Sequence, residues 1–247
     1  MFAAFKTTNQ SADAFTNLSN AIKSVKSSCK DATVLGSFSE NHDNPRFAYV
    51  NDDFASASNI ISFTMLADGI PIIYQGQEQH YAAYGSNNGG NDPYNREALW
   101  FSNYDTSAQL YQLIATLNKI RKNAIRDDSS YLTSNNNPIY TDTTTITMKK
   151  GKMFTVLSNK GSTGANYTQA YSAGYPSGTK VTELLTCSTL TADSTGKITV
   201  PMGAGQPRIY YPSANLGALC GGTAPAPNRG PKNGTKRSIQ PSRHFQR

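Results

Sequence analysis

The sequence predicts two regions in succession, an α/β region followed by an antiparallel β domain. Residues 1–125 combine apolar patterns of helical spacing with short, continuous apolar runs, as expected for helices that connect buried parallel strands. From about residue 126, short strand-like segments alternate with turn signals, which is typical of antiparallel sheets. We therefore expect an α/β region over 1–125, a β-sandwich over 126–220 and a disordered basic tail over 221–247.

Three helices and two strands are expected in the α/β region. Asp52 or Asp53 can cap the second helix, and Asp68-Gly69 ends it. Short apolar runs predict strands at 32–38 and 70–74. Apolar residues three or four positions apart mark the helices: Phe15, Leu18, Ile22 and Val25; Phe54, Ala57, Ile60, Ile61 and Met65; Leu110, Leu113, Ile114, Leu117 and Ile120.

The β domain is expected to contain six strands, separated by turns such as Lys150-Gly151-Lys152. In the α/β region, the two strands predicted at 32–38 and 70–74 cannot close a barrel, which needs eight, and alone they would leave unpaired edges. Residues 1–125 therefore look like the end of a larger α/β fold. The six strands are expected at 138–142, 144–150, 153–159, 181–185, 197–202 and 207–211.

The net charge of +7 comes almost entirely from the tail. Residues 221–247 hold six lysines and arginines and no acid, which leaves +1 for residues 1–220. A nucleic-acid partner is not expected, because a phosphate binder needs clustered basic charge on a folded surface. No run approaches the roughly 20 apolar residues that span a membrane. The start at Met1 lacks the pattern of a signal peptide.

One ten-residue run, F-S-E-N-H-D-N-P-R-F at 38–47, concentrates ionisable side chains directly after the first predicted strand. Glu40, His42, Asp43 and Arg46 lie within seven positions, and Asn44-Pro45 signals a turn. Polar side chains at the carboxyl ends of barrel strands are where such folds carry out chemistry. This run is therefore the first candidate for a functional site.

This run resembles the strand-seven motif of the alpha-amylase family of glycoside hydrolases, in particular the secreted fungal alpha-amylases. Residues 69–79, G-I-P-I-I-Y-Q-G-Q-E-Q, are similar to strand eight and its loop. Residues 89–100, with G-G-N-D-P and N-R-E-A-L-W, resemble the fungal loop on the donor side of the cleft. The resemblance implies a (β/α)₈ TIM barrel, of which this chain holds the last two strands and their helices, followed by the β-sandwich.

The resemblance also implies endo-hydrolysis of α-1,4-glucosidic bonds in starch or glycogen with retention. Retaining enzymes use a carboxylate nucleophile and a carboxylic general acid. In the family these groups follow the fourth and fifth strands, which would precede Met1, as would the main calcium ligands. We therefore expect this chain alone to be inactive and to contain no metal site. Two alternatives stay open: a non-catalytic glucan-binding module, or a truncated or decayed gene product without a stable fold.

By the resemblance, four residues form the candidate site. Asp43 matches the carboxylate that stabilises the transition state, and His42 is expected to donate to hydroxyls of the same sugar. Asp92 and Arg96 are expected to bind a glucose further into the donor side. The residues also allow simpler interpretations, in which Asp43 caps the turn and Asp92 pairs with Arg96 on a surface at i, i+4.

Neighbouring residues are expected to support this site. Glu40 is expected to orient its neighbours, and Arg46 to fix the loop through an ion pair. His80 and Tyr81 follow the second strand, and either sugar contact or loop packing fits their positions.

The odd cysteine count also fits the resemblance. Cys187 and Cys220 match a disulfide of the family's sandwich domain, and Cys29 matches a cysteine whose partner lies upstream. By the same resemblance we expect a secreted monomer that binds starch or maltooligosaccharides.

Overall fold

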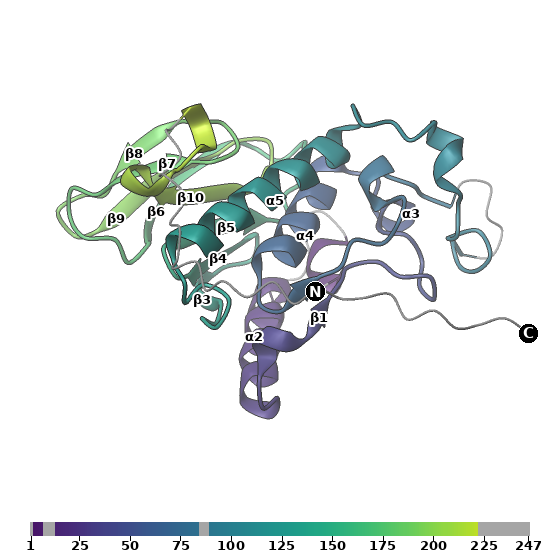
Figure 1. The fold of residues 1–247 in the computed structure, drawn as a ribbon, viewed down its shortest axis with the longest axis horizontal. Helices are drawn as coiled ribbons and strands as arrows, with labels where there is room; N and C mark the ends of the chain where they lie inside the picture. The colour runs from purple at the N-terminus through teal and green to yellow at the C-terminus, as the bar shows by residue number, and fades with distance from the viewer. Residues whose placement is uncertain (1, 7–12, 84–88, 222–247) are drawn as a thin grey trace, which may run out of the picture.

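The structure, a computed structural model, describes residues 2–6, 13–83 and 89–221. The predicted tail at 221–247 therefore lies outside the described residues, except for Gly221. Figure 1 shows the antiparallel β domain at one end of the molecule and the loops around α3 (Phe47–Val50) at the other. Helices α4 (Phe54–Leu66) and α5 (Gln109–Asp127) run side by side between them.

The α/β region contains the three predicted helices and the two predicted strands in the predicted order. Its third long helix is α2 (Ala14–Ser28), and α1 (Phe2–Phe5) is a short helix that the apolar pattern did not predict. Strands β1 (Gly36–Ser37) and β2 (Ile70–Pro71) pair in parallel, with Gly36 opposite Ile70. Asp53, rather than Asp52, caps α4 by accepting a 2.7 Å hydrogen bond from the Ser56 amide.

Both predicted parallel strands are much shorter in the structure. The expected strand at 32–38 begins with a 3₁₀ helix, Ala32–Val34. Its cause is local: the Asp31 carboxylate accepts 2.8 Å and 2.6 Å hydrogen bonds from the amide and hydroxyl of Thr33. Such side-chain bonds offer the backbone an alternative to a sheet ladder. The apolar run therefore marks the strand correctly but overstates its length.

The β domain contains a six-stranded antiparallel sheet and a separate two-stranded sheet. In the larger sheet the strand order is β3-β4-β5-β10-β7-β8, and β6 pairs with β9 in the smaller one. Two of these strands, β6 and β8, were not predicted, because each carries mostly polar or exposed residues. The strands are β3 (Asn137–Thr141), β4 (Thr145–Lys150), β5 (Met153–Ser158), β6 (Tyr167–Ser172), β7 (Lys180–Glu183), β8 (Thr189–Thr191), β9 (Lys197–Met202) and β10 (Arg208–Pro212).

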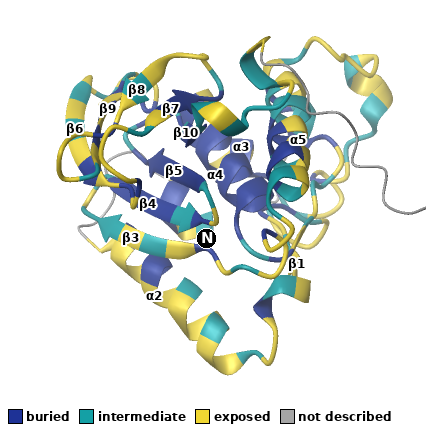
Figure 2. Cartoon of the chain, turned by 60° about the vertical axis from the view of Figure 1, so that its left-hand side comes forward, coloured by how far each residue is buried: buried dark blue, intermediate teal, exposed yellow. Residues whose placement is uncertain are grey.

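Helix α4 is the centre of the main core. Every residue from Ala55 to Leu66 is buried, and Figure 2 shows this helix in dark blue between the sheet and α5. One hydrophobic cluster joins residues of α4 and α5 to residues of the sheet, among them Ile61, Leu117 and Ile146. The division into domains at residue 126 stays a prediction. A second cluster lies between the two sheets and includes Phe154, Tyr171 and Val200.

The buried amide of Asn59 connects α4 to the β domain. Its Nδ2 donates to Ala55 O at 2.7 Å and to Gly205 O at 2.6 Å, and its Oδ1 accepts from the Ser158 amide at 2.8 Å. Each of these hydrogen bonds therefore joins the Asn59 side chain to a backbone group, either in the same helix or in one of two distant segments. Because a buried polar group without partners costs about 1–3 kcal/mol, this amide fixes how α4 docks.

The strand pair β1–β2 leaves apolar side chains in solvent. Val34 is 63% exposed, Ile70 59% and Ile72 47%. Among the described residues, each strand pairs only with the other. Exposed apolar patches of this kind usually mark surfaces that another element covers. Within the described part of the chain, no helix is both long and apolar enough to cross a membrane.

We predict that Asn59→Ala lowers the free energy of unfolding by roughly 2–4 kcal/mol, because it leaves the Ser158 amide and Gly205 carbonyl without their buried partner. Urea unfolding followed by circular dichroism measures this value. The matched control is Asn118→Ala on the exposed face of α5, which should change stability by less than about 0.5 kcal/mol. Equal effects of the two substitutions would contradict the assigned role of Asn59.

Candidate functional site

The candidate site lies on the loops that follow the carboxyl ends of β1 and β2. Because the two strands are parallel and in register, their ends lie at the same edge of the pair. The chain leaves β1 into the 38–47 motif, and after β2 it enters a segment that holds two short 3₁₀ helices, Gln77–Gln79 and Leu99–Ser102. Tertiary structure thus places the two predicted segments beside each other.

Asp43 lies on a turn whose backbone is held by Asn41. Asn41 Oδ1 accepts hydrogen bonds of 3.0 Å from the amide of Asp43 and 3.0 Å from the amide of Asn44, and one of 2.9 Å from Asn44 Nδ2. Asn side chains commonly cap their own turns in this way. Asp43 therefore does not use its carboxylate to cap the turn; Asn41 supplies that bond.

The side chains of His42 and Asp43 point into solvent next to each other. His42 Nε2 lies 3.2 Å from Asp43 Oδ1, and the two side chains are 59% and 67% exposed. The arrangement presents a hydrogen-bond acceptor and a ring nitrogen on one surface. A polyhydroxylated ligand could bond to both groups at once. The simpler role of Asp43, as the cap of its own turn, does not match this geometry.

Arg46 is fully buried beneath the turn. Its Nη1 donates to Glu40 Oε2 at 3.2 Å and to Gln75 O at 2.7 Å, and its Nε donates to Glu97 Oε2 at 3.0 Å. Its guanidinium also lies 4.3 Å from the centre of the Tyr74 ring. The predicted ion pair that fixes this loop is confirmed, and it has two carboxylate partners instead of one.

Glu40 is also buried, and its carboxylate orients its neighbours as predicted. Oε2 accepts from Arg46, and Oε1 accepts from the Phe47 amide at 3.2 Å. Burial raises the pKa of Glu40 to about 7, against the opposing effect of the Arg46 charge. One guanidinium faces two carboxylates here, Glu40 and Glu97, so a proton on Glu40 relieves uncompensated negative charge.

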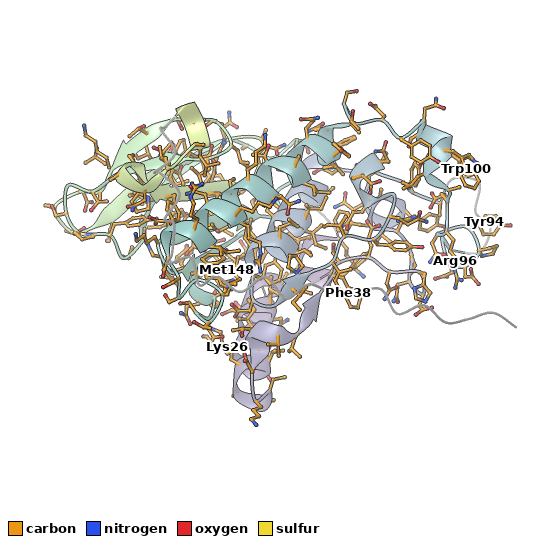
Figure 3. All side chains as sticks on the ribbon, in the orientation of Figure 1. Lys26, Phe38, Tyr94, Arg96, Trp100 and Met148 are labelled. Carbon is orange, nitrogen blue, oxygen red and sulfur yellow. A yellow bond between two sulfur atoms is a disulfide. The ribbon has the colours of Figure 1, made fainter. Side chains whose placement is uncertain are left out.

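Asp92 and Arg96 form the expected pair, with Arg96 Nε 2.7 Å from Asp92 Oδ1. Their side chains are 56% and 47% exposed, so the simple i, i+4 surface pair is present. The same exposure leaves the pair accessible to a ligand. Figure 3 shows Arg96 with Tyr94 and Trp100 at the end of the molecule away from the β domain.

His80 and Tyr81 pack inside the loop rather than facing solvent. The His80 ring packs against Phe54 in a tilted arrangement, with 4.1 Å between ring centres, and its Nε2 lies 3.2 Å from Asp52 Oδ1. Burial lowers the pKa of His80, although Asp52 acts in the opposite direction. The Tyr81 hydroxyl lies 2.8 Å from Ser102 Oγ and 3.2 Å from the carbonyls of Ala98 and Leu99. Loop packing is therefore the role that the geometry gives both residues.

Two residues of this site were missed in the sequence. Asn95 is fully buried and donates from Nδ2 to His42 O at 2.9 Å and to Asn44 O at 2.8 Å. Glu97 accepts from Arg46 and, through Oε1, from the Ala83 amide at 2.6 Å. Both lie in the N-R-E segment at 95–97, but their partners are about 14 to 53 positions away. No local spacing could have predicted these contacts.

Cys187 and Cys220 form a disulfide, the pairing that the resemblance implied, with 5.4 Å between their Cα atoms. Cys29 is a free thiol, half-buried in α2's C-cap. In the part of the chain that the structure describes, no group of three or more His, Cys, Asp or Glu residues could hold a metal ion.

Fold and site together define a class of protein. Two parallel strands that end in polar loops, followed by an antiparallel β domain, form the end of a (β/α)₈ barrel with its sandwich domain. The family model "Alpha amylase, catalytic domain" matches residues 2–101, and "Alpha-amylase, domain C" matches residues 138–227. The chain belongs to the alpha-amylase family of glycoside hydrolases.

Fungal relatives agree with this assignment. The chain is 42% identical over 216 residues to an alpha-amylase of Saccharomycopsis fibuligera, covering 87% of this chain and 42% of the relative. It is 50% identical over 205 residues to alpha-amylase 1 of Lipomyces kononenkoae, covering 81% and 32%. The solved alpha-amylase of Malbranchea cinnamomea superposes with a TM-score of 0.82 at 40% identity, covering 89% and 45%. The chain thus spans less than half the length of each of these proteins.

We predict that the free energy of unfolding of the wild-type chain falls between about pH 5 and pH 8 relative to that of Glu40→Gln. A carboxyl whose folded pKa is about 7 stabilises the fold fully below its unfolded pKa of about 4.5 and loses that contribution as the pH rises through 7. The shift corresponds to roughly 3 kcal/mol at most.

Urea unfolding of both proteins at pH 5, 6, 7 and 8 measures the difference. Asp13→Asn serves as the control, because the Asp13 side chain is exposed and makes no capping hydrogen bond. If the wild type and Glu40→Gln show the same pH dependence, the raised pKa is wrong.

Proposed function

We propose that this chain carries one wall of an alpha-amylase active site, in an enzyme that hydrolyses internal α-1,4-glucosidic bonds of starch or glycogen with retention. The observation that carries the proposal is the exposed carboxylate of Asp43, 3.2 Å from His42 on a turn fixed by Asn41. In this role Asp43 accepts hydrogen bonds from hydroxyls of the sugar at the scissile bond. Those bonds strengthen as the ring distorts towards an oxocarbenium-like state.

The neighbouring groups extend this wall. His42 donates to hydroxyls of the same sugar, and Arg96, held by Asp92 at 2.7 Å, binds a glucose further into the donor side. A guanidinium suits this role because its planar array of donors matches paired hydroxyl oxygens. A hollow of about 430 Å³ next to the turn is lined by Phe38, Asn41 and Asn44, among others, and offers amide groups to a sugar.

The hydrolytic step needs two further carboxyl groups. A retaining glycosidase holds a nucleophile and a general acid about 5–5.5 Å apart, and the resemblance assigns neither role to a residue of this sequence. We propose that both, with the main calcium ligands, belong to the part of the enzyme outside this sequence. The exposed apolar residues Val34, Ile70 and Ile72 support this proposal, because a completed barrel would cover them.

The same reasoning leads to proposals for the partner, the oligomeric state and the location of the protein. We propose starch or maltooligosaccharides as its partner, a monomeric state and an extracellular location, all in keeping with its fungal relatives. The Cys187–Cys220 disulfide supports the location, because disulfides persist in oxidising compartments.

A second candidate function is glucan binding without catalysis. The turn around Asp43 and the exposed aromatic rings of Tyr94 and Trp100 are available in this chain as it stands. Aromatic faces with adjacent hydrogen-bonding groups suit sugar rings. This candidate needs no further catalytic residue, but it gives no specific role to the pairing of His42 with Asp43.

We predict that residues 1–247 alone release no reducing sugar from soluble starch, because Asp43 assists but does not perform bond cleavage. Joined to the preceding part of the Saccharomycopsis fibuligera alpha-amylase, the chain should become active. In that chimera, Asp43→Ala should lower kcat/KM by about 100-fold or more, since contacts of this type supply several kcal/mol.

The control in the chimera is Asp13→Asn, which removes an exposed carboxylate far from the motif in sequence and should leave the rate within about twofold. Starch hydrolysis by the purified chain, above that of a mock preparation, would overturn the proposed inactivity. If Asp43→Ala left kcat/KM of an active chimera unchanged, the proposed role of Asp43 would be wrong.

We also predict weak binding of maltoheptaose to the chain alone, with a Kd in the millimolar range, because only one wall of the cleft is present. Isothermal titration calorimetry measures it, and Arg96→Ala should weaken it several-fold by removing the donors of Arg96. The absence of heat at millimolar sugar would exclude the binding-module function but leave the chimera experiment unaffected.

A further inference from the structure

Asn95 lies directly beneath the Asp43 turn and is fully buried. Its two amide hydrogens are used on the two carbonyls that flank Asp43, His42 O at 2.9 Å and Asn44 O at 2.8 Å. The backbone carbonyl of Asn95 in turn accepts a 3.3 Å hydrogen bond from the Tyr74 hydroxyl. One residue therefore contacts the loop after β1 and the loop after β2.

We propose that Asn95 is a positioning residue, which fixes the Asp43 turn and couples it to the Arg96 segment. The importance of Asn95 for catalysis rests on the proposed function, whereas its effect on the rigidity of the turn does not. The Asn95 amide supplies two donors to these two carbonyls; aspartate has no donor, and alanine has neither donor nor acceptor. The acceptors also set the amide orientation, because the reverse one would place Oδ1 against two carbonyl oxygens.

The turn is held from opposite sides by two asparagines. Asn41 Oδ1 binds the amides of Asp43 and Asn44, while Asn95 Nδ2 binds the carbonyls of His42 and Asn44. Backbone groups on both sides of Asp43 are thus fixed, although its side chain is 67% exposed. This arrangement limits the motion of the carboxylate to its own side-chain torsions. A site needs its polar groups held within about 0.5 Å of the productive geometry.

The coupling follows from the position of Asn95 in the chain. It directly precedes Arg96, whose Nε pairs with Asp92 at 2.7 Å. The next residue, Glu97, binds the buried Arg46 and receives a 3.1 Å hydrogen bond from Gln75 Nε2 at its carbonyl. A displacement of Asn95 therefore moves the Arg96 segment and releases the Asp43 turn together.

The first experiment measures the turn without any sugar. Backbone ¹⁵N order parameters of Asp43 and Asn44 are compared among wild type, Asn95→Ala and Asn95→Asp. We expect a fall from the rigid range, about 0.85, towards the flexible range, below about 0.6, in both variants. The fall should be at least as large in Asn95→Asp, because its carboxylate oxygens would face the two carbonyls.

The matched control is Asn123→Ala. Asn123 is also buried, and its Nδ2 donates to the Asn215 carbonyl at 3.0 Å, away from the Asp43 turn. This control loses the bond to Asn215 and the one that Asn123 Oδ1 accepts from Arg126 Nη2 at 2.5 Å, but it should leave the order parameters of Asp43 and Asn44 unchanged. If Asn95→Ala and Asn123→Ala change them equally, or if Asn95→Asp leaves them at wild-type values, the positioning role is overturned.

The second experiment tests the coupling between Asn95 and Asp43 in the active chimera, with kcat and KM measured separately. Asp43→Ala is introduced into the wild-type and Asn95→Ala backgrounds. We expect its effect on kcat/KM to be at least threefold smaller in the Asn95→Ala background, because the released carboxylate already contributes less. Equal effects in both backgrounds overturn the coupling. An inactive chimera contradicts the proposed function, while the order parameters still decide the positioning role.

Discussion

The buried guanidinium of Arg46 holds together the three segments that build the candidate site. It reaches Glu40 on the segment after β1, the Gln75 carbonyl after β2, and Glu97 further along the chain. Burying a cation is costly unless opposite charge and acceptors accompany it, and the three segments together supply these to Nε and Nη1 of Arg46. The Asp43 turn and the Arg96 segment are both carried on this framework, since each lies within three residues of one of these contacts.

The helix α4 places a similar demand on the rest of the fold. It is buried on every side, yet it carries Ser58, Asn59 and Thr64. Ser58 and Thr64 donate to carbonyls of their own helix, at 2.7 and 2.9 Å. Asn59 reaches across to the β domain, where it binds Gly205 and Ser158. Apolar packing therefore holds α4 in place, while one amide sets its alignment to the sheet.

The hydrophobic core and the candidate site occupy different parts of the α/β region. Apolar contacts gather around α4, α5 and the sheet, whereas the polar loops extend from the far ends of β1 and β2. Such loops can hold exposed ionisable groups because the elements below them are rigid. The Glu40–Arg46–Glu97 cluster lies at the boundary, where one buried guanidinium faces two carboxylates. The exposed His42 and Asp43 lie just beyond it.

Local patterns in the sequence determined the order of the long helices, the two parallel strands and the motif at 38–47, because apolar periodicity and turn residues act over a few positions. They also marked Asp43, His42, Asp92 and Arg96 as the candidate site, through a family resemblance that the comparisons support. They overstated the strand at 32–38, where the Asp31 side chain diverts the backbone, and missed the largely polar strands β6 and β8.

Only the tertiary structure decided how these pieces meet. The contacts of Asn95 with the Asp43 turn and of Arg46 with Glu97 join positions about 51 to 53 residues apart. No local periodicity of the sequence extends over such separations. The partners depend on which buried polar groups lie near one another once β1 and β2 have paired. The sequence by itself therefore determined which residues are the candidates for a functional site, and the tertiary structure decided which residues hold them in place.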